Sequence, residues 1–193
     1  MRISFILCLL ALVAFGCNAE KPSPTQPADN APAAPSVESP GDDAVTVQIK
    51  DYDGLRELLA GKRGKVVVMD CWSTWCSPCV KEFPGLVELH KKYGPQRVAC
   101  VSLSFDYFGG KDDTPEEHQE AVLEFLRSKN ATFDNVLAGV PADDLYGLLG
   151  LETASVPAIL VYDREGKVAR QFEGEDARYS EVDKLVAELI EQP

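Results

Sequence analysis

Cys76 and Cys79 lie on either side of Ser77-Pro78, between an apolar run and a helical pattern, and this arrangement constrains the fold more than any other feature. The apolar run, residues 65–72, is rich in β-branched side chains, as is typical of a buried strand. A helix beginning here would expose the Cys76 thiol to unpaired backbone N–H groups and to the positive end of the helix dipole. Both favour the thiolate. The pattern therefore predicts a strand-turn-helix unit in which Cys76 is the nucleophile and Cys79 resolves a mixed disulfide.

Other uses of a Cys-x-x-Cys pair fit this sequence less well. A zinc site needs about four ligands, but no second such pair occurs, and His90 and His118 lie outside the motif, so no metal site is predicted. Covalent haem attachment requires a histidine directly after the second cysteine, where this chain has Val80. A purely structural disulfide remains an alternative, although so short a loop removes little chain entropy.

The start of the chain predicts export. Met1-Arg2, the apolar residues 3–15 and Gly16-Cys17 are typical of a signal peptide rather than a membrane span, which needs roughly 20 apolar residues. Residues 14–17 resemble a bacterial lipobox, so Cys17 is the candidate lipidation site and mature N-terminus. Cleavage after Ala19, which would leave a soluble protein, is the alternative.

Three segments are therefore expected: a signal peptide at 1–16, a disordered Pro/Ala-rich linker at 17–44, and one folded domain at 45–193. The chain carries 19 Lys and Arg against 31 Asp and Glu, a net charge of −12. This balance argues against a nucleic acid partner and against electrostatic binding to anionic lipid. Any membrane attachment is expected through the acyl group.

Apolar periodicity predicts alternating strands and helices in the folded domain. Strands are expected at 45–49, 65–71, 98–104, 133–138, 158–162 and 168–172. Helices are expected at 51–60, from Cys79 to Gly94, from a Thr114 capping box to 129, at 142–149, and after a Ser180 cap. This order predicts a mixed α/β sandwich around a central sheet.

Residues 70–79 resemble the active-site unit of the thioredoxin superfamily. Pro84 falls where the helix of that family is kinked, and residues 155–157 resemble its cis-proline loop. The long segment 96–150, with its extra helix, resembles the membrane-anchored TlpA/ResA branch. The resemblance implies a thioredoxin-like α/β fold, a central mixed β-sheet flanked by helices, with a helix inserted between the active-site helix and the cis-proline loop.

Further site residues follow from their positions around the two cysteines. Burial of Asp70 at a strand end would raise its pKa and let it exchange a proton with Cys79, unless its carboxylate reaches solvent. A cis bond before Pro157 would turn the Val156 backbone outward to pair with a substrate peptide, the alternative being a trans proline that leads a strand.

Three residues of the motif itself have expected roles at the surface or in redox tuning. Trp75 is expected to line the substrate contact surface. Ser77 and Pro78 are expected to tune the redox potential, since Pro78 offers no N–H donor to the thiolate. No bound cofactor is expected.

The remaining features carry weaker predictions. Cys71 and Cys100 are expected to be buried and inert. Residues 105–113 follow a strand that should end beside Cys76, so Tyr107 and Phe108 either recognise a protein partner or simply anchor the loop.

The residues and the resemblance together predict an extracytoplasmic, lipid-anchored thiol-disulfide oxidoreductase of the cell envelope. The resemblance implies that it reduces disulfide-containing proteins, in cytochrome c maturation or redox homeostasis, with a membrane thiol relay as electron donor. The alternatives are a disulfide oxidant or isomerase, and an anchored adaptor whose cysteines stay paired. A peroxidase of the related peroxiredoxins is disfavoured, because Met69 and Ser73 occupy the Pro and Thr positions of the Pro-x-x-x-Thr-x-x-Cys pattern.

Overall fold

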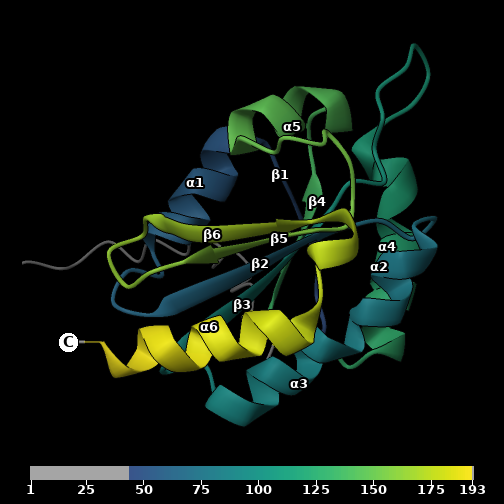
Figure 1. The fold of residues 1–193 in the computed structure, drawn as a ribbon. Coiled ribbons are helices and arrows are strands. Elements are labelled where there is room, and N and C mark those ends of the chain that lie inside the picture. The colour runs from purple at the N-terminus through teal and green to yellow at the C-terminus, as the bar shows by residue number, and fades with distance from the viewer. Residues whose placement is uncertain (1–43, 193) are drawn as a thin grey trace, which may run out of the picture. The chain divides into compact units, whose positions relative to one another are not determined.

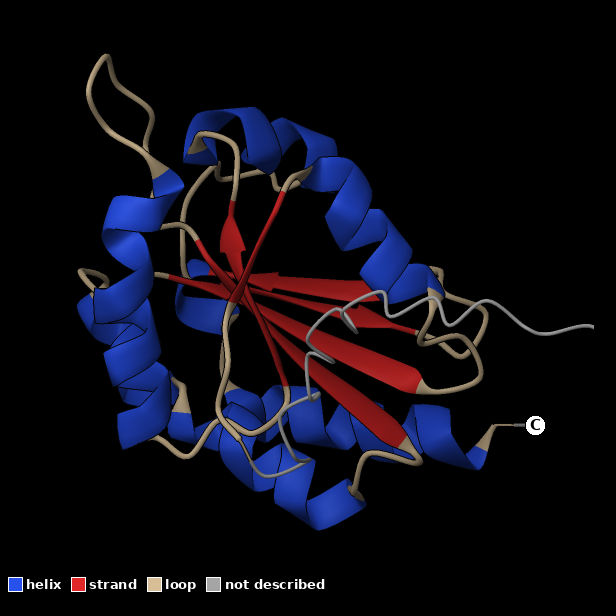
Figure 2. Cartoon of the chain, turned by 180° about the vertical axis from the view of Figure 1, so that it is seen from behind, coloured by secondary structure: helices blue, strands red, loops and turns tan. Residues whose placement is uncertain are grey.

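Residues 44–192, the part of the chain described in the computed structural model, form a sheet with helices on both faces (Figure 1, Figure 2). The strands are β1 (Gln48–Lys50), β2 (Val66–Trp72), β3 (Val98–Ser104), β4 (Asp134–Ala138), β5 (Ala158–Tyr162) and β6 (Val168–Glu173). The helices are α1 (Tyr52–Ala60), α2 (Ser77–Glu82), α3 (Pro84–Tyr93), α4 (Pro115–Ser128), α5 (Ala142–Leu149) and α6 (Tyr179–Glu191), with a 3₁₀ turn, η1, at Gly174–Asp176.

The predicted signal peptide, the candidate lipidation site Cys17 and nearly all of the predicted linker lie outside the described residues. No helix within residues 44–192 is long and apolar enough to cross a bilayer.

The sheet has the order β1-β4-β3-β2-β5-β6 and mixes parallel with antiparallel pairs. Strands β1 to β4 pair in parallel, whereas β5 is antiparallel to both β2 and β6. Every residue of β2 is buried, since this central strand is covered on both faces and needs apolar side chains on both. The predicted mixed α/β fold is confirmed.

Side chains alternate along β2 between the two layers of helices, as the period of a strand requires. Val66, Val68 and Trp72 face the core shared with α2, α3, α4 and α6, whereas residues 67, 69 and 71 face the core under α1 and α5. Figure 1 shows α3 and α6 on one side of the sheet and α1 and α5 on the other. Asp70 therefore lies on the same face as the active-site helix.

The parallel pairing of β2 with β3 places their carboxyl ends at one edge of the sheet. Trp72, the last residue of β2, lies opposite Ser104, the last residue of β3. The turn that leads to Cys76 and the loop that begins at Phe105 therefore start side by side, as expected from the sequence.

Several predicted boundaries differ from those observed, most of them by one residue, as for β2, which was predicted at 65–71 and spans Val66–Trp72. Strand β1 begins at Gln48 rather than at 45. The active-site helix begins at Ser77 rather than at Cys79 and, as expected from Pro84, is interrupted at Phe83 between α2 and α3, because Pro84 has no N–H to continue the hydrogen-bond ladder. The last helix begins at Tyr179 with Arg178 as its N-cap, so Ser180 lies inside it.

Candidate active site

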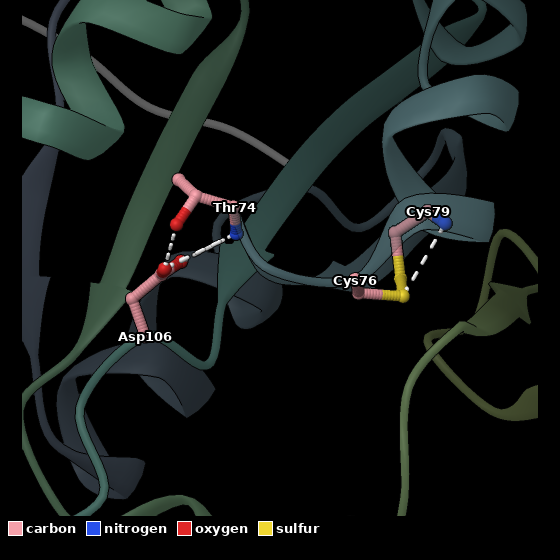
Figure 3. The surroundings of a disulfide bond; sticks show 4 residues. All are labelled: Thr74, Cys76, Cys79 and Asp106. Atoms are coloured by element: carbon pink, nitrogen blue, oxygen red, sulfur yellow. Dashed lines mark hydrogen bonds between the residues drawn. A yellow bond between two sulfur atoms is a disulfide. The ribbon is translucent and has the colours of Figure 1, made fainter.

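Cys76 and Cys79 form a disulfide at the start of α2 (Figure 3). Cys76 is the N-cap residue, and its Sγ accepts a hydrogen bond from the backbone N–H of Cys79, at 3.3 Å. Both residues are nearly buried, with 5% of Cys76 and 2% of Cys79 exposed. A sulfur at Cys76 thus receives one backbone donor, and Pro78, at the start of the helix, adds none.

Asp70 is buried in β2, two residues before the strand ends at Trp72, with 4% of its surface exposed. Its Oδ2 accepts a hydrogen bond from the Tyr179 hydroxyl, at 2.7 Å. Burial raises the pKa of Asp70 from 3.8 to about 7; the Tyr179 hydrogen bond opposes this rise, and the negative charge of Glu82 adds to it. At neutral pH this carboxyl is therefore poised between its two protonation states, as a proton carrier requires.

Tyr179 reaches Asp70 because α3 and α6 approach closely at Gly85. A Cβ at Gly85 would lie 2.4 Å from Cγ of the Tyr179 ring, so any larger residue there would displace the ring. Neither residue was predicted from the sequence as part of the site. Their contact becomes visible only when the two helices are placed on the same face of the sheet.

The Val156–Pro157 peptide bond is cis. Ala158, the first residue of β5, pairs with Cys71 in β2, which brings Pro157 to the edge of the sheet that carries the dithiol. The Pro157 carbonyl accepts a hydrogen bond from the N–H of Gly174, at 3.0 Å. Pairing of a substrate peptide with Val156, which is half-buried here, stays a prediction.

The carboxylate of Asp106 holds the turn that precedes Cys76. Its oxygens accept hydrogen bonds from the Thr74 N–H, both at 3.1 Å, and from the Thr74 hydroxyl (Figure 3). They also accept one from the Ser104 hydroxyl, at 2.6 Å. Asp106 is buried and directly follows the loop's first residue after β3. Asp106 was not predicted from the sequence, although an aspartate just after a buried strand that ends beside the dithiol was a usable signal.

The aromatic residues of the loop after β3 differ in how deeply they are buried. Phe105 is buried and stacks on Tyr146, with ring centroids 5.0 Å apart. Phe108 is 47% exposed and packs beside Trp75, which is 55% exposed, with ring centroids 5.2 Å apart. One ring therefore anchors the loop, and another lies at the surface next to the residue that precedes Cys76.

Comparisons with known proteins agree with this geometry. The model of the AhpC/TSA family matches residues 32–180. The chain belongs to the AhpC/TSA family. Thiol-disulfide oxidoreductase ResA of Bacillus subtilis (strain 168) is 30% identical over 136 residues, which cover 70% of this chain and 68% of that one. ResA of Bacillus cereus (strain ATCC 10987 / NRS 248) is 29% identical over 139 residues, 72% of each chain.

Solved structures show the same fold. A thiol:disulfide interchange protein of the DsbE type from Chlorobium tepidum superposes with a TM-score of 0.55 at 25% identity, over 68% of this chain and 84% of that one. This member of the AhpC/TSA family is thus a thiol-disulfide oxidoreductase of the ResA/DsbE type, and the predicted thioredoxin-like enzyme class is confirmed. The thiol-disulfide oxidoreductase class implies disulfide-containing proteins as substrates.

Cys71 and Cys100 are free, buried and located on opposite faces of the sheet. They cannot pair with each other across the sheet, and burial raises the pKa of both thiols. No group of three or more His, Cys, Asp or Glu side chains within residues 44–192 is arranged to hold a metal ion. Among the cysteines of the described domain, Cys76 and Cys79 are the bonded pair.

Replacing Asp106 with alanine is expected to destabilise the fold by about 3 kcal/mol, because two half-buried donors on Thr74 and the buried hydroxyl of Ser104 lose their acceptor. Urea unfolding of the oxidised protein measures the change. The matched control is Asp112→Ala, at an exposed carboxylate of the same loop, which should change the stability by less than about 0.5 kcal/mol. Equal effects of the two substitutions would contradict the assigned role of Asp106.

Proposed function

We propose that this oxidoreductase reduces protein disulfides outside the cytoplasm, with Cys76 as nucleophile and Cys79 as resolving residue. The Cys76 thiolate attacks one sulfur of the substrate disulfide, forming a mixed disulfide and releasing the other sulfur as a thiolate. The Cys79 sulfur then attacks Cys76, releasing the second substrate sulfur and closing the Cys76–Cys79 disulfide. Two electrons pass to the substrate, and a thiol donor must reduce the enzyme again. The observation that carries this proposal is the bonded pair at the start of α2.

Electrostatics around the pair supports the reducing direction. Strong oxidants of this class owe their potential to a stabilised thiolate, and nearby negative charge disfavours a thiolate. Two buried acidic side chains lie close to the motif: Asp70 is in β2, two residues before the end of the strand, and Asp106 binds Thr74, two residues before Cys76. A single backbone N–H reaches the Cys76 sulfur among the hydrogen bonds of the described domain.

The reduction potential of the pair tests the direction. The purified protein is equilibrated in graded thiol-disulfide buffers, and the fraction of Cys76–Cys79 disulfide is measured by mass after alkylation, with Cys76→Ser as the control. We expect a value near the thioredoxin end of the range, about −270 mV, as befits a reductant. A value near about −120 mV would identify an oxidant instead.

Export and lipid attachment rest on the first residues. We propose a signal peptide at 1–16, acylated Cys17 as the mature N-terminus, and a linker at 17–44 that holds the domain at 45–193 away from the membrane. This location would let a membrane thiol relay supply the electrons. Mass spectrometry of the mature N-terminus tests the anchor: a chain that begins at Glu20, without a diacylglyceryl group, would contradict it.

An isomerase and a redox-inactive adaptor remain the competing functions. Reduction of insulin in the presence of dithiothreitol separates an active dithiol from an adaptor whose cysteines stay paired. The reductant is expected to accelerate insulin reduction, and an adaptor would leave the rate unchanged. A chain that also reactivates a scrambled, disulfide-rich protein would point to isomerisation.

A further inference from the structure

Two of the few large apolar side chains exposed on the described domain lie next to the dithiol. The exposed set within residues 44–192 is Trp75, Phe108, Leu148 and Val168. Trp75 directly precedes Cys76, and its ring contacts that of Phe108. Aromatic rings left in water give up the free energy of burial, so a contacting pair of them beside reactive sulfur is typical of a recognition surface.

The loop holds Phe108 outward by fixed contacts on both sides of it. Phe105 is anchored in the core against Tyr146. The carbonyl of Tyr107 accepts a hydrogen bond from the N–H of Ala142, at 3.0 Å. Gly109 has a φ of +77°, and a Cβ there would lie 2.7 Å from the ring of Pro141. A surface that is organised before binding loses less conformational entropy when a partner docks.

The Asp106 carboxylate joins the two segments that carry the rings. Thr74, which it binds, immediately precedes Trp75, and Asp106 itself lies two residues before Phe108. Figure 3 shows this link beside the Cys76–Cys79 disulfide. The separation between the two rings is therefore set by the half-buried hydrogen bonds between Thr74 and Asp106 as well as by the contact of the rings.

Thiol-disulfide exchange at Cys76 determines which part of a substrate contacts the surface formed by Trp75 and Phe108. The substrate disulfide must align with the Cys76 sulfur, and Cys76 is only 5% exposed, so the chain flanking the substrate cysteine has to lie across the immediate neighbours of Cys76. Trp75 is one of those neighbours, and Phe108 extends the apolar surface beyond it.

We propose that the Trp75–Phe108 pair, held by Asp106, binds an apolar side chain adjacent to the cysteine of a disulfide-bearing protein substrate. This inference rests on the proposed reduction of protein disulfides and adds a sequence preference to it. Substrates with a large apolar residue beside the cysteine are selected, and those with a small polar residue there react more slowly.

Two synthetic peptides test this preference against the full-length, reduced protein. Each carries the same intramolecular disulfide, length and charge, with Leu next to the attacked cysteine in one and Ser in the other. The wild type is expected to reduce the Leu peptide about tenfold faster. Phe108→Ser is expected to bring the ratio of the two rate constants close to one, whereas Phe108→Leu, which retains an apolar side chain, should keep most of it.

The matched control is Leu148→Ser, which removes an equally exposed apolar side chain from α5 and should keep the wild-type ratio. A ratio near one in the wild type, or a tenfold ratio that survives in Phe108→Ser, would overturn the inference while leaving the reductase function standing. A wild type that reduces neither peptide would overturn both. Because the ratio is internal to each variant, partial loss of folded protein does not change it.

Discussion

Cys76→Ser is expected to abolish disulfide reduction, with a loss on the order of a thousandfold or more, because a serine hydroxyl cannot attack a disulfide at neutral pH. Cys79→Ser is expected to retain the first half of the reaction and lose the second. Its Cys76 would attack a substrate disulfide, and no sulfur would then resolve the product. The variant should therefore accumulate a covalent adduct with the substrate.

Mass spectrometry of each variant after exposure to a disulfide peptide distinguishes the two roles. The adduct on Cys79→Ser should have the mass of protein plus peptide and should disappear with dithiothreitol. Cys100→Ser, which removes a buried free thiol, serves as the control and is expected to reduce the peptide at the wild-type rate. An adduct on Cys76→Ser, with none on Cys79→Ser, would exchange the two assignments.

Elements with strong local signals were predicted closely from the sequence. Strand β3 and helix α5 have the predicted bounds, and β5 and β6 form the predicted antiparallel hairpin. A contiguous apolar run shows where a strand begins and ends, and a complete capping box shows where a helix begins, without information from distant residues. The start of α6 was predicted at the wrong residue because Tyr179 is drawn into the core by its bond to Asp70, a contact between residues 109 positions apart.

The candidate site residues also divide into those with a local sequence signal and those that depend on contacts between distant parts of the chain. A motif and its spacing identified Cys76, Cys79, Asp70 and Pro157 as candidate site residues. Asp106 acts through Thr74, 32 positions away, so its role appears only when β2 and β3 are known to be neighbours. Local pattern also could not tell Phe105, which is buried, from Phe108, which is exposed, since both are aromatic residues of one short loop.

Asp70→Asn is expected to stabilise the oxidised protein at alkaline pH by up to roughly 4 kcal/mol, the free energy that corresponds to a carboxyl pKa of about 7 when folded against 3.8 when unfolded. The folded state binds the proton more tightly, so this group favours folding below pH 3.8 and loses that contribution as the pH rises to about 7. Asparagine resembles the protonated carboxyl and has no charge to bury. The gain should therefore vanish near pH 4.

Urea unfolding of both proteins from pH 4 to 8 measures this difference, and peptide reduction over the same range tests the proton role. The wild-type rate should show an inflection near pH 7 that Asp70→Asn lacks. Tyr179→Phe provides a second test. In the wild type the Tyr179 hydroxyl lowers the pKa of Asp70, so its removal should raise that pKa further. The decline in stability of this variant should therefore extend to higher pH. A stability difference between wild type and Asp70→Asn that is constant with pH would mean that Asp70 ionises in the folded protein as it does in the unfolded chain. The carboxyl would then have no raised pKa with which to exchange a proton with Cys79.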